Sequence, residues 1–80
     1  MAKPKYNDDF DKTMLEIANK LKQLRLEAGY TSYENFAWDN DINRMQYWKM
    51  EKGITNFTMR SLHKVLKAHN MDFNEFFNKN

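Results

Sequence analysis

Residues 32–53 read SYENFAWDNDINRMQYWKMEKG, and this stretch decides the fold of the chain. Its apolar spacing predicts a short helix over residues 32–40 and a second over residues 44–51. Asn43, with Gln46 three residues later, has the pattern of a helix cap at the start of the second helix. About three residues separate the two helices, and so short a connection forces a sharp crossing instead of an antiparallel hairpin.

Several residues in this stretch suit such a crossing. Ala37 is small and lies midway along the first helix, so the second helix can approach it closely. Asp41 lies where the chain must reverse, and Asp tolerates a left-handed backbone better than most residues. Thr31 or Ser32 can cap the first helix, whose inward face is expected to be Tyr33, Phe36, Ala37 and Asn40. The stretch therefore predicts helix-turn-helix geometry.

A longer amphipathic helix is expected before this pair. Its apolar residues recur at steps of four and three, at Phe10, Met14, Ile17, Leu21, Leu24 and Ala28. Asp8 or Asp9 can cap the start of this helix, and Gly29 can end it. Residues 1–7 are therefore expected to be a flexible tail, and residues 8–80 to form a single domain.

Two further helices are predicted after Gly53. Thr58 can cap a helix over residues 59–69, whose buried side chains are expected to be Met59, Leu62, Val65 and Leu66. Asp72 and Glu75 form a capping-box pair before a helix of little more than one turn, residues 73–77. The whole pattern predicts an all-α, five-helix compact domain with a central helix-turn-helix.

Length and composition exclude several classes of protein. Eighty residues suffice for one domain, and the hydrophobic fraction of 41% supplies a core. The absence of cysteine excludes disulfide scaffolds, thiol catalysis and cysteine zinc sites. No apolar run approaches the roughly 20 residues that cross a bilayer, and the N-terminus does not read as a signal peptide. We therefore expect a cytoplasmic protein that does not bind membranes.

Charge is distributed unevenly along the chain. Residues 26–41 contain four acidic side chains and no Lys or Arg. Residues 42–70 reverse this balance, with the basic side chains Arg44, Lys49, Lys52, Arg60, Lys64 and Lys67 against Glu51 alone. A basic half on a small domain favours a polyanionic partner, and the alternative is an ordinary solvated helix face.

A family resemblance is carried by Leu24-Arg25, Phe36-Ala37, Ile42-Asn43, Met50-Glu51-Lys52-Gly53, Leu62, Val65-Leu66, Met71 and Phe73 through Phe77. With these residues the chain resembles the phage-repressor and Cro-type helix-turn-helix domains, the lambda repressor-like XRE family. Three features depart from that pattern. Asp41 replaces the common turn glycine, Tyr33 stands where the family often has a phosphate-binding Gln, and the loop over residues 29–32 is one residue longer.

The helical repeat divides residues 44–51 into two faces. Tyr47, Met50 and Glu51 point toward the core, whereas the side chains expected to point outward are Arg44, Met45, Trp48 and Lys49. The resemblance implies that Arg44, Met45 and Lys49 read DNA bases. Trp48 either contacts the DNA backbone or a base edge, or packs on a neighbouring helix.

Other roles are implied by the same resemblance. The residues placed like phosphate contacts are Asn43, Lys52, Thr55 and Asn56. Tyr33 either donates its hydroxyl to a phosphate or packs in the core. Glu51 points inward and needs a partner, which the resemblance identifies as Arg25 in a structural ion pair.

Catalytic and metal sites are not expected. His63 and His69 lie on different faces of one predicted helix, so a shared metal site is not expected. No P-loop, nucleophile elbow or HExxH motif is present. We therefore expect no enzyme activity, no cofactor and no metal.

The sequence therefore predicts a small transcriptional regulator that binds specific double-stranded DNA, with residues 44–51 in the major groove. The alternative is a protein-interaction module with the same fold, for example an antitoxin-like or polymerase-partner protein, and the acidic first helix of the pair favours it. Phe77 is expected to lie apart from Phe73 and Phe76 on the last helix. It either contributes to a homodimer contact or folds back on the first long helix.

Overall fold

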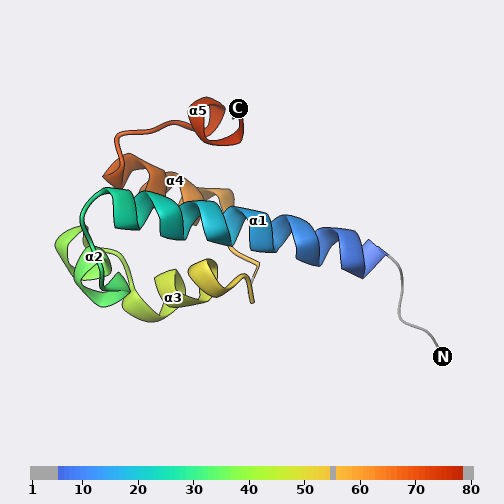
Figure 1. Ribbon diagram of the computed structural model, residues 1–80, viewed down its shortest axis with the longest axis horizontal. Coiled ribbons are helices and arrows are strands. Elements are labelled where there is room, and N and C mark those ends of the chain that lie inside the picture. Colours follow the sequence, from blue (N-terminus) through green and yellow to red (C-terminus); the bar gives the residue numbers. More distant parts are fainter. Residues whose placement is uncertain (1–5, 55, 79–80) are drawn as a thin grey trace.

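Helices account for most of the described chain, which comprises residues 6–54 and 56–78 of a computed structural model. The helices are α1 (Tyr6–Glu27), α2 (Tyr33–Asp39), α3 (Arg44–Lys52), α4 (Met59–Ala68) and α5 (Phe73–Phe77). No strand occurs in these residues, so the predicted all-α fold class is confirmed. Figure 1 shows α1 along the length of the molecule, with α2 and α3 on one side of it and α4 and α5 on the other.

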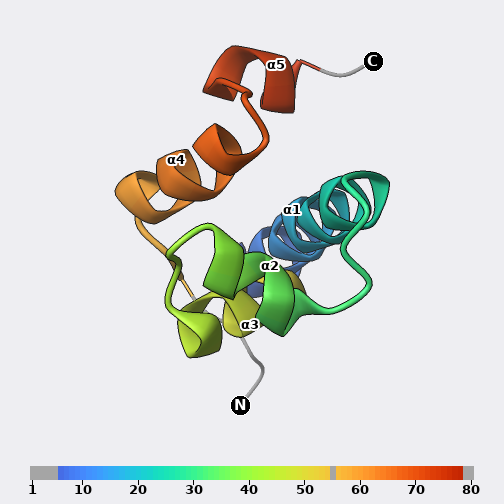
Figure 2. The ribbon, with the colours of Figure 1, turned by 90° about the vertical axis from the view of Figure 1, so that its left-hand side faces the viewer.

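One core joins all five helices. Its buried members are Leu21 of α1, Phe36 and Ala37 of α2, Ile42 of the following turn, Tyr47 and Met50 of α3, Leu62, Val65 and Leu66 of α4, and Phe76 of α5. Figure 2 shows α4 and α1 on opposite sides above α2. The inward residues predicted for α3 and most of those predicted for α4 are therefore confirmed.

The N-terminal end of α1 differs from the prediction. The helix begins at Tyr6, so Asp8 and Asp9 lie inside it and neither is its cap. Acidic residues are as favourable in the first helical turn as at the cap, and the sequence alone could not separate the two positions. Residues 1–5 of the expected tail lie outside the described residues, and Tyr6 and Asn7 belong to α1.

Three residues of the predicted apolar helix faces lie at the surface. Phe10 is 49% exposed because the first turns of α1 project beyond the other helices, as Figure 1 shows. Ala28 is exposed because α1 ends at Glu27, so Ala28 does not continue the apolar face of that helix. Met59 is 58% exposed at the first residue of α4. The spacing of apolar residues indicates which face of a helix is apolar, but not how far its neighbours extend along it.

The predicted caps explain where the later helices begin. The side chains of Ser32, Asn43, Thr58 and Asp72 each accept a hydrogen bond from the backbone N–H three residues on. Only Asp72 forms the full reciprocal capping box, with Glu75. In these caps the side-chain oxygen satisfies an N–H group that has no partner within the helix.

Left-handed backbone conformations form the turns. Asp41 has a φ of 57° between α2 and α3, as predicted, and Gly53 ends α3 with a φ of 69°. A side chain at Gly53 would crowd α1, because a Cβ atom there would lie 3.2 Å from the Leu15 side chain. Asn70 also has a φ of 57°, between α4 and α5, and the sequence analysis did not identify it.

A buried ion pair fastens α3 to α1. Arg25 donates from Nε to Glu51 Oε2 at 2.6 Å and from Nη2 to Glu51 Oε1 at 3.0 Å. Its third nitrogen, Nη1, donates to the backbone carbonyl of Tyr30 at 2.9 Å. Each side chain of the pair is only 6% exposed, and the Glu51 carboxylate raises the pKa of Arg25. Three parts of the chain are therefore held by one guanidinium group.

Removing either Arg25 or Glu51 from the ion pair is expected to lower the stability of the fold. Glu51→Gln leaves the Arg25 charge buried without its counter-ion, so the free energy of unfolding should fall by about 3 kcal/mol. Replacing both Arg25 and Glu51 with Met should cost less than the single change, because no charge is then buried. Urea unfolding followed by circular dichroism measures both. Equal losses in the single and double variants would contradict this coupling.

A second prediction concerns pH. The His69 ring stacks on Phe36, with ring centroids 5.0 Å apart, and its buried Nε2 atom has no hydrogen-bond partner within residues 6–54 and 56–78. Burial lowers the pKa of His69 from its ordinary value of 6.5. The unfolded chain therefore takes up this proton more readily than the folded one, and the free energy of unfolding should fall as the pH drops below about 6.5.

Unfolding curves between about pH 7.5 and pH 5.5 test this dependence in a range where most carboxylates stay ionised. His69→Asn should remove the fall in the free energy of unfolding that is caused by protonation of His69. His63→Asn is the control, since His63 is exposed on α4, the helix that His69 caps, and it should leave the dependence in place. A dependence that His63→Asn removes and His69→Asn retains would show that the wrong histidine was identified.

Candidate nucleic-acid interface

Helix α3 carries the candidate surface, and local interactions define both its ends. Asn43 Oδ1 accepts from the Gln46 backbone N–H at 2.8 Å at its start. At its end the N–H of Gly53 bonds the Lys49 and Met50 carbonyls. Lys49 and Lys52 lie in the last turn, where positive charge is favourable beside the carbonyl end of the helix.

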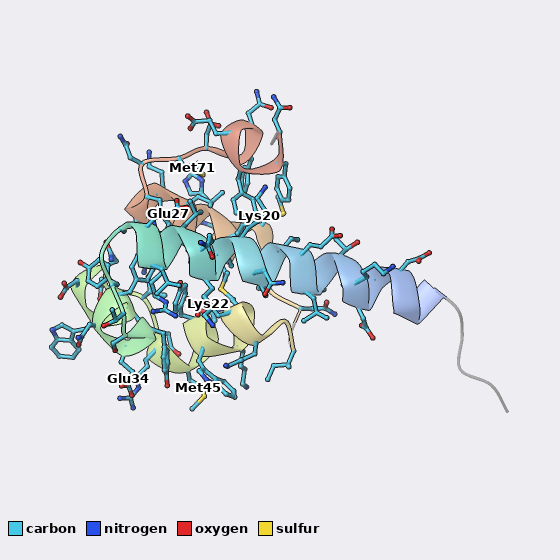
Figure 3. All side chains as sticks on the ribbon, viewed as in Figure 1. Lys20, Lys22, Glu27, Glu34, Met45 and Met71 are labelled. Carbon is cyan, nitrogen blue, oxygen red and sulfur yellow. The ribbon has the colours of Figure 1, made fainter. Side chains whose placement is uncertain are left out.

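The two predicted faces of α3 are distinct. Tyr47 and Met50 are fully buried, and Tyr47 packs against the Phe36 ring of α2 with centroids 5.0 Å apart. Arg44, Met45 and Lys49 are exposed on the other face. Figure 3 shows that Met45 points away from α1, on the same side of the molecule as Glu34 of α2. Two of these exposed side chains are cationic and the third is apolar.

Trp48 lies between the two faces. Its side chain is half-buried, and the Lys52 ammonium group lies 5.9 Å from its ring centroid, within the range of a cation–π contact. The ring therefore packs partly against its own helix and keeps a solvent-facing edge. This position is compatible with a packing role and with contact to a partner.

A small hydrogen-bond network fixes α3 against α4. The Gln46 side chain donates from Nε2 to Ser61 Oγ at 2.9 Å, and the Thr58 hydroxyl donates to the same oxygen at 3.2 Å. Gln46 thus bonds α4 instead of completing a capping box with Asn43, as its sequence pattern had suggested. No local signal in the sequence distinguishes Asn43 from Ser61 as the partner of the Gln46 side chain.

The residues expected to contact phosphate are only partly brought together. Asn43, Lys52 and Asn56 are exposed at or near the ends of α3, whereas Thr55 lies outside the described residues. Tyr33 is half-buried and packs against the core, in line with the second role considered for it. Its phosphate contact stays a prediction.

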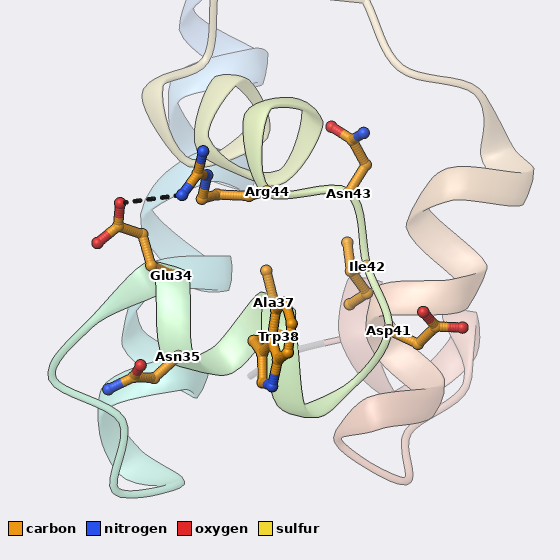
Figure 4. Close-up of a pocket in the computed structure, with 8 residues that line it drawn as sticks. All are labelled: Glu34, Asn35, Ala37, Trp38, Asp41, Ile42, Asn43 and Arg44. Carbon is orange, nitrogen blue, oxygen red and sulfur yellow. Dashed lines mark ion pairs between the residues drawn. The ribbon is translucent and has the colours of Figure 1, made fainter.

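An ion pair connects α2 and α3 on the candidate surface. Arg44 Nη1 lies 3.7 Å from Glu34 Oε2, and the two side chains remain 66% and 55% exposed. They face one another across a groove of about 600 Å³ between the helices, shown in Figure 4. Glu34 as the partner of Arg44 does not follow from the sequence, because the two residues lie on different helices.

The charges of α2 differ from those of α3 and α4. The acidic residues Glu34, Asp39 and Asp41 are exposed on or just after α2. Trp38 lies among them with 85% of its surface exposed, an exposure that the sequence pattern does not predict. The basic side chains of α3 and α4 are exposed as well, namely Arg44, Lys49, Lys52, Arg60, Lys64 and Lys67. The acidic helix α2 therefore lies beside two helices, α3 and α4, whose exposed charged side chains are mostly basic.

Residues 6–54 and 56–78 contain no group of three or more His, Asp or Glu side chains placed to hold a metal ion. The histidines of α4 and its cap have separate environments, with His63 near Phe73 and His69 on Phe36. None of the described helices is long and apolar enough to cross a membrane.

A sequence comparison establishes the family. Control protein C.MunI of a Mycoplasma species is 33% identical to this chain over 63 residues, which cover 79% of this chain and 85% of the relative. The chain belongs to the family of this control protein. The identity extends over most of both proteins and is therefore not confined to one motif. No protein-family model matches the sequence, and no solved structure matches it.

Proposed function

We propose that the protein is a regulator that binds specific sequences of double-stranded DNA, with α3 in the major groove and α2 across the backbone. The observation that carries the proposal is the division of α3, which buries Tyr47 and Met50 completely and exposes Arg44, Met45 and Lys49. A helix held rigidly by one face and presenting cationic groups on the other is suited to reading a polyanionic duplex.

Each exposed side chain has a matching group on DNA. Arg44 and Lys49 can donate to the O6 and N7 atoms of guanine, and the Met45 side chain can contact the methyl group of thymine. Asn43, Lys52 and Asn56 are proposed to bond phosphates, as are the hydroxyls of Tyr33 and Thr55. Such contacts set the register of the protein on the duplex without reading its sequence.

Family membership supports a regulatory role, because the relative is named a control protein. The narrower assignment to the phage-repressor type rests on the motif resemblance of residues 32–77. We propose a cytoplasmic binding protein that needs no cofactor and carries out no catalytic step.

A second candidate function is binding to another protein. The observation in its favour is Trp38, an aromatic side chain 85% exposed beside Glu34 and Asp41 at the α2–α3 groove. Aromatic residues at this exposure are typical anchors of protein interfaces. A titration with random duplex DNA at two salt concentrations separates the two functions. Binding that weakens steeply with salt supports DNA, since each neutralised phosphate contributes roughly −0.9 to the log–log slope.

Two variants separate base reading from phosphate contact. Arg44→Ala should cost about 1–3 kcal/mol on a preferred duplex and relax the preference at one base pair. Lys52→Ala should weaken binding to all sequences alike and reduce the salt slope by about one. The preferred duplex is obtained by selection from a random pool, and fluorescence anisotropy measures the affinities. Identical behaviour of both variants on preferred and random DNA would contradict the assignment of the recognition face.

We further propose that the protein binds as a homodimer with Phe77 at the contact. Phe76 is buried in the core, whereas Phe77 is 52% exposed. The prediction that Phe77 lies apart from Phe73 and Phe76 was wrong, because its ring meets Phe76 edge-on at 5.0 Å and stacks on Phe73 at 6.4 Å between centroids. Phe77→Ser should therefore reduce self-association while leaving the core intact. Sedimentation of both proteins, with and without a palindromic duplex, measures the mass. Equal masses under every condition would exclude Phe77 from such a contact.

A further inference from the structure

The ion pair between Glu34 and Arg44 places an acidic group beside the principal base-reading candidate. Glu34 lies in the first turn of α2, and Arg44 is the first residue of α3. Figure 4 shows the two side chains pointing toward one another at the mouth of the groove. The Nη1 atom of Arg44 lies 3.7 Å from Glu34 Oε2. At this distance the two groups attract one another without a hydrogen bond, so the N–H groups of the guanidinium are available for another partner.

An acidic group in this position distinguishes between two kinds of DNA contact. A phosphate carries a full negative charge, so the Glu34 carboxylate competes with it for Arg44 and also repels it. A guanine edge is uncharged and offers two aligned acceptors, which bond two donors of one guanidinium. Arg44 has five such donors, and can bond the base while Nη1 stays near Glu34. The carboxylate thus opposes phosphate contact more than base contact.

We propose that Glu34 is a specificity-determining residue, which restrains Arg44 from phosphates on random DNA and orients it toward a guanine in the preferred site. This inference rests on the proposed function, because it assigns Arg44 to a base. Glu34 acts through Arg44 and is therefore a positioning residue. The negative charge of Glu34 on the surface that is proposed to face DNA then has a function, because it lowers the affinity for DNA sequences other than the preferred site.

A matched control is available in the same groove. Asp41 lines the groove and is exposed, and within residues 6–54 and 56–78 its carboxylate forms no ion pair with Arg44. Asp41→Asn removes the same charge as Glu34→Gln. Asn also tolerates the left-handed backbone at this position, where φ is 57°. The two variants therefore differ in whether the lost carboxylate was paired with Arg44.

The experiment measures the affinities of the wild type, Glu34→Gln and Asp41→Asn for a selected duplex and for random duplex. Glu34→Gln should bind random DNA about two- to fivefold more tightly, in keeping with the small contribution of an exposed ion pair. Its affinity for the selected duplex should stay nearly constant, because lower repulsion offsets the poorer orientation of Arg44. The ratio of the two affinities should therefore fall two- to fivefold, whereas Asp41→Asn should leave this ratio unchanged.

Arg44→Ala tests the route of the effect. In the Arg44→Ala protein, Glu34→Gln should change the affinities for the selected and the random duplex by the same factor. The ratio of these two affinities should therefore stay constant. An unchanged ratio for Glu34→Gln alone, or an equal fall in the Arg44→Ala background, would overturn the inference. Thermal unfolding checks that each variant is folded.

The two levels of proposal fail differently. A wild type that prefers no sequence in the selection overturns the proposed function and this inference with it. A wild type with a clear preference, combined with an unchanged ratio for Glu34→Gln, overturns the inference about Glu34 only.

Discussion

The bidentate bond between Arg25 and Glu51 is the interaction on which the orientation of α3 depends. Arg25 lies in the last turn of α1, and Glu51 lies near the end of α3. The third nitrogen of the same guanidinium bonds the Tyr30 carbonyl in the loop between α1 and α2. Buried charges are costly unless they are paired and hydrogen-bonded. The three hydrogen bonds of Arg25 form only when the two helices and the loop are in place together, so the pair favours one arrangement over looser ones.

That arrangement lets α3 present a surface while remaining part of the core. Its inward side chains meet Phe36 of α2, and Gln46 bonds Ser61 at the start of α4. Both ends and one face of the helix are therefore fixed before any partner binds. A surface held in this way loses little conformational entropy on association, which is the physical advantage of a preorganised site.

The proposed interface combines charges of opposite sign, and their geometry determines what each one does. The sequence shows Arg44 only as a cation, whereas in the structure it forms an ion pair with Glu34 of the neighbouring helix. Trp38 reads as one more aromatic residue in a short helix, yet it is almost fully exposed beside the same groove. Neither feature follows from local pattern, because both depend on the angle at which α2 crosses α3.

The sequence by itself determined the helix starts at Arg44, Met59 and Phe73, the left-handed turn at Asp41 and the inward face of α3. These features arise from interactions within a few residues, such as caps and helical spacing, which any reader of the sequence can identify. The tertiary structure alone decided that Phe10 and Met59 are exposed, that Gln46 bonds Ser61, and that Glu34 lies opposite Arg44. Each of these depends on where a distant helix ends or crosses, and that position is set by the packing of the whole core.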